Sequence, residues 1–127
     1  MKTILTAILI VAAAAIYSSC KKGNSFTSVN VQEFANAIAQ PGTQIVDVRT
    51  AEEYAAGHID GSINIDVKNS NFKETANTLL NKNKEVALYC RSGRRSKLAA
   101  DILSAQGYSV VELDGGYIEW TKHHCAK

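Results

Sequence analysis

The chain has 127 residues, 46% of them hydrophobic and 20% charged, with a formal net charge of +2. This profile excludes a disordered chain and predicts one folded domain, and the near balance of charge excludes a protein that coats nucleic acid. Three cysteines are too few for a disulfide framework, so at least one of them is interpreted as a reactive thiol.

The N-terminal segment has the pattern of an export signal. Lys2 precedes an apolar run over 4–16 that is too short to span a bilayer comfortably. The "YSSCKK" that follows resembles the lipobox of a bacterial lipoprotein, which implies cleavage before Cys20 and a lipid on its sulfur. We expect a membrane-anchored lipoprotein of the bacterial periplasm, with a signal peptide over 1–19, a lipid-attached polar tether over 20–27 and a domain over 28–127. An ordinary secretory signal with a spectator cysteine is the alternative.

Helices and strands alternate along the rest of the chain. Asn30 with Glu33, and Thr50 with Glu53, have the spacing of a capping box, which opens a helix. Apolar runs predict strands at "QIVDV" (44–48), "SINI" (62–65), "EVALYC" (85–90) and "YSVVELD" (108–114). Two longer helices have apolar faces, which we assign to Phe72, Ala76, Leu79 and Leu80 and to Leu98, Ala99, Ile102 and Leu103. A last helix contains Trp120, which we expect in the core.

Strands that are apolar throughout and alternate with helices predict an α/β fold, with a central parallel sheet of about five strands and helices on both faces. In such a sheet, ligands bind beyond the carboxyl ends of the strands, where the amides of the next helix point outward.

Cys90 comes at the carboxyl end of the third of these strands, and a short cationic loop follows it. The positive end of the next helix and the nearby arginines favour the thiolate, which is the nucleophilic form. Gly93 lets successive N–H groups converge on one sulfur or one anion. A buried, inert cysteine is the alternative, but such cysteines are not usually followed by Arg, Gly, Arg and Arg at a helix start.

The segment "YCRSGRRS" (89–96) resembles the active-site loop of the rhodanese-like sulfurtransferases. The segments "VDVRTAEEYAAGHIDGSINI" (46–65) and "VVELDGGYIEW" (110–120) resemble further motifs of that family, in the same order. The resemblance implies a rhodanese-like fold, no cofactor, and a Cys90 persulfide that carries sulfur from a small anionic donor such as thiosulfate to a thiol or cyanide acceptor. It also implies that the rest of the loop binds the donor, through Arg91, Ser92, Gly93, Arg94, Arg95 and Ser96.

Within this loop we expect Arg91 and Arg95 to form a cationic rim, whereas for Arg94 we give equal weight to facing solvent and to binding the donor. Phosphatases with a catalytic cysteine place an arginine after five intervening residues, where this chain has Ser96. The six-residue loop from Cys90 to Arg95 therefore favours sulfur over phosphoryl chemistry. A catalytically idle rhodanese-like module that binds a partner or senses redox state is the alternative function.

Other polar residues are interpreted as structural. Asp47, Arg49 and Glu53 resemble the family's bracing motif, and His58 is expected to pack and hydrogen-bond near the sheet edge rather than act as a base. "HHC" (123–125) offers three possible metal ligands, but neighbouring residues at a chain end rarely converge on one ion, so we expect no metal. We expect a monomer.

Overall fold

The computed structural model describes residues 25–124, so the expected signal peptide, Cys20, most of the tether and Cys125 lie outside the described residues. The strands are β1 (Thr27–Val29), β2 (Gln44–Asp47), β3 (Ile63–Asn64), β4 (Val86–Tyr89) and β5 (Val110–Leu113). The helices are α2 (Val31–Ile38), α3 (Ala51–Ala56), α4 (Phe72–Leu79), α5 (Arg94–Ala105) and α6 (Gly116–His124). Within this range the structure contains no helix long and apolar enough to cross a membrane.

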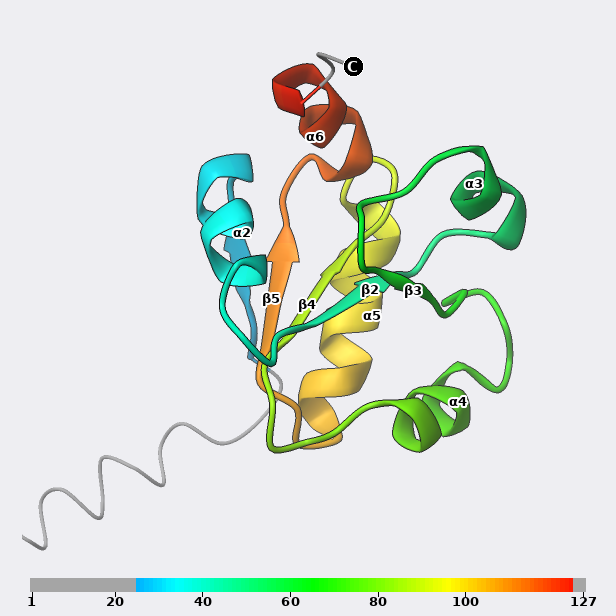
Figure 1. Cartoon of the computed structure of the whole chain (residues 1–127). Helices are drawn as coiled ribbons and strands as arrows, with labels where there is room; N and C mark the ends of the chain where they lie inside the picture. The colour runs from blue at the N-terminus through cyan, green and yellow to red at the C-terminus, as the bar shows by residue number, and fades with distance from the viewer. Residues whose placement is uncertain (1–24, 125–127) are drawn as a thin grey trace, which may run out of the picture.

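The five strands form one parallel sheet in the order β1-β5-β4-β2-β3, with helices around it (Figure 1). The predicted α/β class and parallel sheet are therefore confirmed. Strands β4 and β2 are neighbours at the centre, yet the chain leaves β2 toward β3 and leaves β4 toward β5 on the opposite side. In open parallel sheets, ligands bind at the carboxyl ends of the strands whose connections diverge in this way, which here are β2 and β4.

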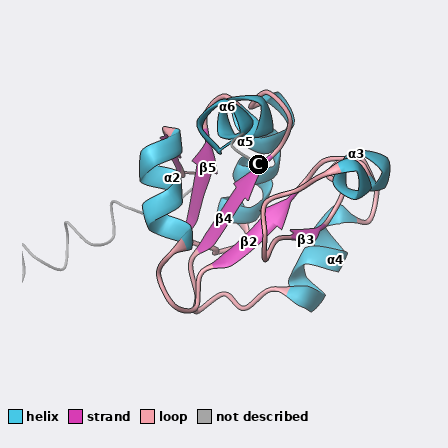
Figure 2. Ribbon diagram, turned by 45° about the horizontal axis from the view of Figure 1, so that its top comes forward, coloured by secondary structure: helices cyan, strands magenta, loops and turns pink. Residues whose placement is uncertain are grey.

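Helices lie on both faces of the sheet (Figure 2), and an apolar cluster packs on each face. Strand β4 shows why its sequence is apolar throughout: Val86 and Leu88 pack in the cluster that includes α4 and α5. Ala87 and Tyr89 pack in the other cluster, with residues of α2 and α6. Successive side chains of a strand point to opposite faces, so a strand buried on both sides needs apolar residues at every position. Trp120 is partly buried at the edge of the second cluster.

Both predicted capping boxes are present. Asn30 Oδ1 accepts a hydrogen bond from the Glu33 N–H at 2.9 Å, and the Glu33 carboxylate accepts one from the Asn30 N–H at 3.0 Å. Thr50 and Glu53 make the same reciprocal pair at the start of α3. These contacts satisfy amides that the first turn of each helix leaves without partners.

Two leucines assigned to apolar helix faces are exposed instead. Leu79 and Leu98 are each 55% exposed. The buried stripe of α5 follows the positions i, i+3, i+4, i+7 and i+8 from Ser96, and Leu98 lies off that stripe. Because this stripe begins with the polar residue Ser96, the apolar pattern of the sequence did not indicate its register. In α4 the buried face is completed by Leu80, the residue after the helix, rather than by Leu79.

Strand β1 begins within the segment expected to be a tether. Thr27 is its first residue and pairs with Val111 of β5, so the sheet starts one residue before the expected domain boundary. The run "TSV" has no apolar periodicity of its own. It is extended because β5 offers an edge with which its backbone can pair.

Candidate active site

Cys90 directly follows the central strand β4, at the carboxyl ends of the neighbouring strands β4 and β2. Cys90 is 1% exposed, and the Gly93 N–H donates a hydrogen bond to Cys90 Sγ at 3.1 Å. Gly93 has φ +107° and precedes α5, and a Cβ there would lie 3.2 Å from the Gly115 nitrogen. Glycine is needed at this position because the backbone must turn back over the sulfur while another loop passes close by.

The start of α6 holds the Cys90 loop from outside. The Tyr117 N–H donates to the Cys90 carbonyl at 2.8 Å, and the Ile118 N–H donates to the Arg91 carbonyl at 3.0 Å. Gly116, with φ +64°, lies against the same backbone, where a Cβ would stand 2.5 Å from the Arg91 oxygen. The segment after β5 thus fixes the conformation of the loop after β4.

Glu112 and Ser96 lie beside the cysteine, and the sequence analysis missed Glu112. The Cys90 S–H donates to Ser96 Oγ at 3.4 Å, and the Ser96 hydroxyl donates to Glu112 Oε2 at 2.6 Å. Glu112 and Ser96 are both 0% exposed. The signal was present, because Val110 and Glu112 share a face of a strand predicted to be buried, and a carboxylate is rare in such a place.

The three loop arginines are not equivalent. Arg91 and Arg94 are exposed, and among residues 25–124 neither guanidinium has an ion-pair partner. Arg95, which we expect in the cationic rim, is held by Glu53 of α3 through contacts of 2.8 and 3.0 Å. Those hydrogen bonds raise the pKa of Arg95, with a smaller contribution from the Cys90 sulfur, so its charge still acts on the site.

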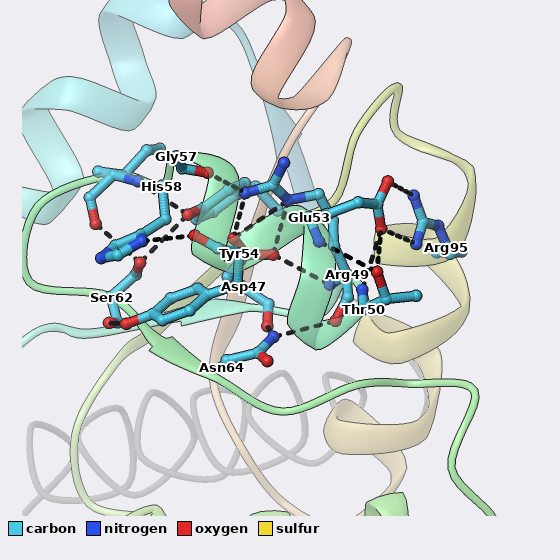
Figure 3. A network of polar contacts seen from close by, with 12 residues as sticks. Asp47, Arg49, Thr50, Glu53, Tyr54, Gly57, His58, Ser62, Asn64 and Arg95 are labelled. Atoms are coloured by element: carbon cyan, nitrogen blue, oxygen red, sulfur yellow. Dashed lines mark hydrogen bonds and ion pairs between the residues drawn. The ribbon is translucent and has the colours of Figure 1, made fainter.

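Glu53 therefore braces the Cys90 loop by pairing with Arg95, and it does not pair with Arg49. Hydrogen bonds from Arg95 hold the pKa of Glu53 at about 2, against the effect of partial burial. The same carboxylate accepts from the Thr50 N–H at 3.0 Å, which places it at the start of α3 (Figure 3). The pair ties the segment after β2 to the first turn of α5 by one bidentate contact.

Asp47 and Arg49 form the expected ion pair, with Arg49 Nη2 at 2.6 Å from Asp47 Oδ2 (Figure 3). Burial lowers the pKa of Arg49, but the hydrogen bonds and charge of Asp47 outweigh this effect and leave that pKa raised. Arg49 Nη2 also donates to the Gly57 carbonyl at 2.7 Å, and its guanidinium lies 4.4 Å from the centre of the Tyr117 ring. All of these contacts of Asp47 and Arg49 are with other groups of the protein, which suits a structural role.

His58 belongs to the polar network around α3, and the other two histidines lie on the last helix. His58 is exposed, stacks on Tyr54 with the ring centres 3.7 Å apart, and its Nδ1 lies 2.8 Å from the Tyr54 carbonyl oxygen (Figure 3). His123 and His124 are exposed on α6. Residues 25–124 contain no group of three or more potential ligands that could hold a metal ion.

The family model for the rhodanese-like domain matches residues 30–123. The chain belongs to the rhodanese-like family. It is 36% identical over 118 residues to thiosulfate sulfurtransferase 18 of Arabidopsis thaliana, a match that covers 84% of this chain and 86% of that protein. It is 42% identical over 71 residues to thiosulfate sulfurtransferase PspE of Escherichia coli, covering 56% of this chain and 67% of that protein.

Solved structures give the same assignment. A rhodanese-related protein from Thermoplasma volcanium is 30% identical, with a TM-score of 0.66, and the match covers 77% of this chain and 93% of that one. A rhodanese-like domain protein from Staphylococcus aureus is 32% identical with the same TM-score of 0.66, covering 75% of this chain and 91% of that one. By fold and by relatives the chain is therefore a rhodanese-like domain, and two of its relatives are named thiosulfate sulfurtransferases.

Proposed function

We propose that the domain is a working sulfurtransferase, in which Cys90 accepts a sulfane sulfur from a small anionic donor such as thiosulfate. The observation that carries the proposal is the Gly93 N–H aimed at Cys90 Sγ at 3.1 Å, within a loop that displays two guanidinium groups without an ion-pair partner among the described residues. An amide donor stabilises a sulfur anion, and exposed cations attract a doubly charged donor.

The reaction consists of two balanced displacements on sulfur. In the first, the Cys90 thiolate attacks the outer sulfur of thiosulfate, a new S–S bond forms, the donor's S–S bond breaks, and sulfite leaves with the bonding electrons. In the second, cyanide or a thiolate attacks the outer persulfide sulfur and Cys90 is released as thiolate. The sulfur is anionic before and after each step, so the Gly93 amide can stabilise it throughout the cycle.

The loop arginines supply the cationic surroundings in different ways. Arg91 and Arg94 are exposed and available to a donor arriving from solvent. Arg95 is fixed in place by Glu53, so its charge is already oriented before the donor binds. A preoriented charge stabilises the departing sulfite without first having to reorganise. We therefore keep Arg91 and Arg95 as residues of the cationic rim and add the exposed Arg94 to it.

The rival function is a module that binds a partner or senses redox state without turnover. An intact thiol held by an amide donor favours the enzyme, because a binding module has no need for a nucleophile that oxidants can modify irreversibly. The acceptor is proposed only by class, as a thiol or cyanide.

Incubation of the purified domain with thiosulfate and cyanide tests the proposal. We expect thiocyanate and sulfite in equal amounts and no measurable hydrolysis of an aryl phosphate, because Ser96 stands where cysteine phosphatases have their arginine. Raising the ionic strength should weaken thiosulfate turnover by screening the attraction of the exposed arginines. Phosphate release without thiocyanate formation would contradict the proposal, and the absence of both products would favour the binding module.

We also propose that the chain is exported and anchored through a lipid on Cys20. The support is the "YSSCKK" pattern after a short apolar run. Two or more acyl chains anchor a protein stably, since each buried methylene contributes about 0.8 kcal/mol. The full chain expressed in a bacterium should enter the detergent phase on phase separation, and a Cys20→Ala variant should not. A wild-type chain that stays in the aqueous phase would leave plain secretion as the better interpretation.

A further inference from the structure

Glu112 is a carboxylate in the core that the sulfur-transfer steps do not use. It lies on β5, opposite Ser28 of β1 and Leu88 of β4, and is 0% exposed. A buried carboxylate is costly unless it is hydrogen-bonded. Glu112 is satisfied by the hydroxyls of Ser28 and Ser96 and by Lys97 Nζ, which is 3.4 Å from Oε2.

The direction of the hydrogen bonds links this carboxylate to the nucleophile. A serine hydroxyl has a single proton, and Ser96 donates it to Glu112 Oε2 at 2.6 Å. Only lone pairs of Ser96 Oγ are then left for Cys90, whose S–H donates to it at 3.4 Å. In this state Ser96 cannot donate to the sulfur, so the Gly93 N–H is the donor that the sulfur has.

We propose that Cys90 and Glu112 share one proton through Ser96, and that Glu112 is a positioning residue for the nucleophile. When the thiol ionises, the S–H bond breaks and its proton joins Ser96 Oγ, while the original Ser96 proton moves to Glu112 Oε2. One negative charge passes from the carboxylate to the sulfur, no proton is lost, and nothing is oxidised or reduced. Ser96 then donates to the sulfur anion, which gains a second donor beside the Gly93 N–H.

The surroundings of Glu112 fit a site that holds one net negative charge. Among the described residues, the charged or titratable groups that face it are Lys97 of α5 and, beyond Ser96, Cys90 after β4. Strand β1 contributes the neutral Ser28, and Lys97 also binds Asp114 at 2.9 Å. A single cation can balance either the carboxylate or the thiolate, whereas both together would place two negative charges within one buried cluster.

This inference deepens the proposed function, since it concerns how the same sulfur is made nucleophilic, and iodoacetamide tests it without any sulfur donor. The rate of Cys90 alkylation in the full chain is followed against pH by mass spectrometry of the Cys90 peptide. Two coupled groups that share a proton lose their protons in two steps that belong to the pair. The wild-type rate should therefore rise in two steps, the first of which gives a thiolate with the proton on Glu112.

The variant Glu112→Gln cannot take up the proton, so its profile should lose the first step and rise once. Ser96→Ala removes the hydroxyl that donates to the sulfur anion once the proton is on Glu112, so the height of its first step should fall, which keeps the test decisive if the Gln variant fails to fold. Asp114→Asn is the matched control, because it removes a carboxylate that binds the same Lys97 but does not touch Ser96, and it should keep both steps. A single step in the wild type, two steps in Glu112→Gln, or a first step of undiminished height in Ser96→Ala would overturn the shared proton. Two steps in a chain that forms no thiocyanate would instead count against the proposed function alone.

Discussion

Replacing Cys90 with serine should reduce sulfur transfer by at least about a thousandfold, the order of loss seen when an enzyme's nucleophile is removed. A serine hydroxyl gives no appreciable anion near neutral pH, and it cannot hold a transferable sulfur as a persulfide. Thiocyanate formation measures the loss. Mass spectrometry after thiosulfate treatment should find one added sulfur on Cys90 of the wild-type chain and none on the variant.

The fold of the Cys90→Ser variant should survive, because serine is close to cysteine in size and can accept from the Gly93 N–H that now contacts the sulfur. Circular dichroism and cooperative thermal unfolding check this. Cys125→Ser is the control for the loss of a thiol elsewhere in the chain, and it should keep both turnover and the added sulfur on Cys90. Thiocyanate formation by a folded Cys90→Ser variant would rule out the persulfide mechanism.

Local signals explain which elements the sequence could predict. The capping pairs Asn30–Glu33 and Thr50–Glu53 place each donor and acceptor three residues apart, so nothing outside the segment is needed. The strand over 86–89 is apolar at every position because both of its faces are covered. The position of Cys90 follows from the second of these signals, because Cys90 is the first residue after that strand and comes just before a helix.

Local sequence signals could not predict contacts between residues that are far apart in the chain. Arg91, Arg94 and Arg95 look equivalent in the loop sequence, and only the placement of α3 brings Glu53 to Arg95 across 42 residues. Strand β1 likewise exists because β5 pairs with it. Glu112 is different, because it does have a local signal. Its alternation with Val110 along the strand indicates that a carboxylate faces the core, but this pattern does not indicate that Ser96 joins the carboxylate to the sulfur.

Replacing Gly116 with alanine should destabilise the domain by about 3 kcal/mol or more and remove most of the sulfur transfer. The new Cβ would lie 2.5 Å from the Arg91 carbonyl carbon and oxygen and 2.7 Å from the Cys90 carbonyl oxygen. These are backbone atoms, so no side chain can move aside to relieve the contact. Relief requires the start of α6 to withdraw, which breaks the hydrogen bond from the Tyr117 N–H to the Cys90 carbonyl.

A matched control separates this contact from the conformational cost of alanine. Gly42 also has a left-handed backbone, with φ +89°, but the nearest atom to a Cβ there is Lys84 Cδ at 4.0 Å. Gly42→Ala should therefore cost only about 1–2 kcal/mol, the strain of that backbone region, and keep its thiocyanate production. Urea unfolding of both variants gives the free energies of unfolding, and turnover is compared under conditions where each is folded. Equal losses in the two variants would mean that the contact between α6 and the Cys90 loop does not hold the nucleophile in place, whereas a loss of turnover confined to Gly116→Ala shows that the segment after β5 is part of what shapes the site.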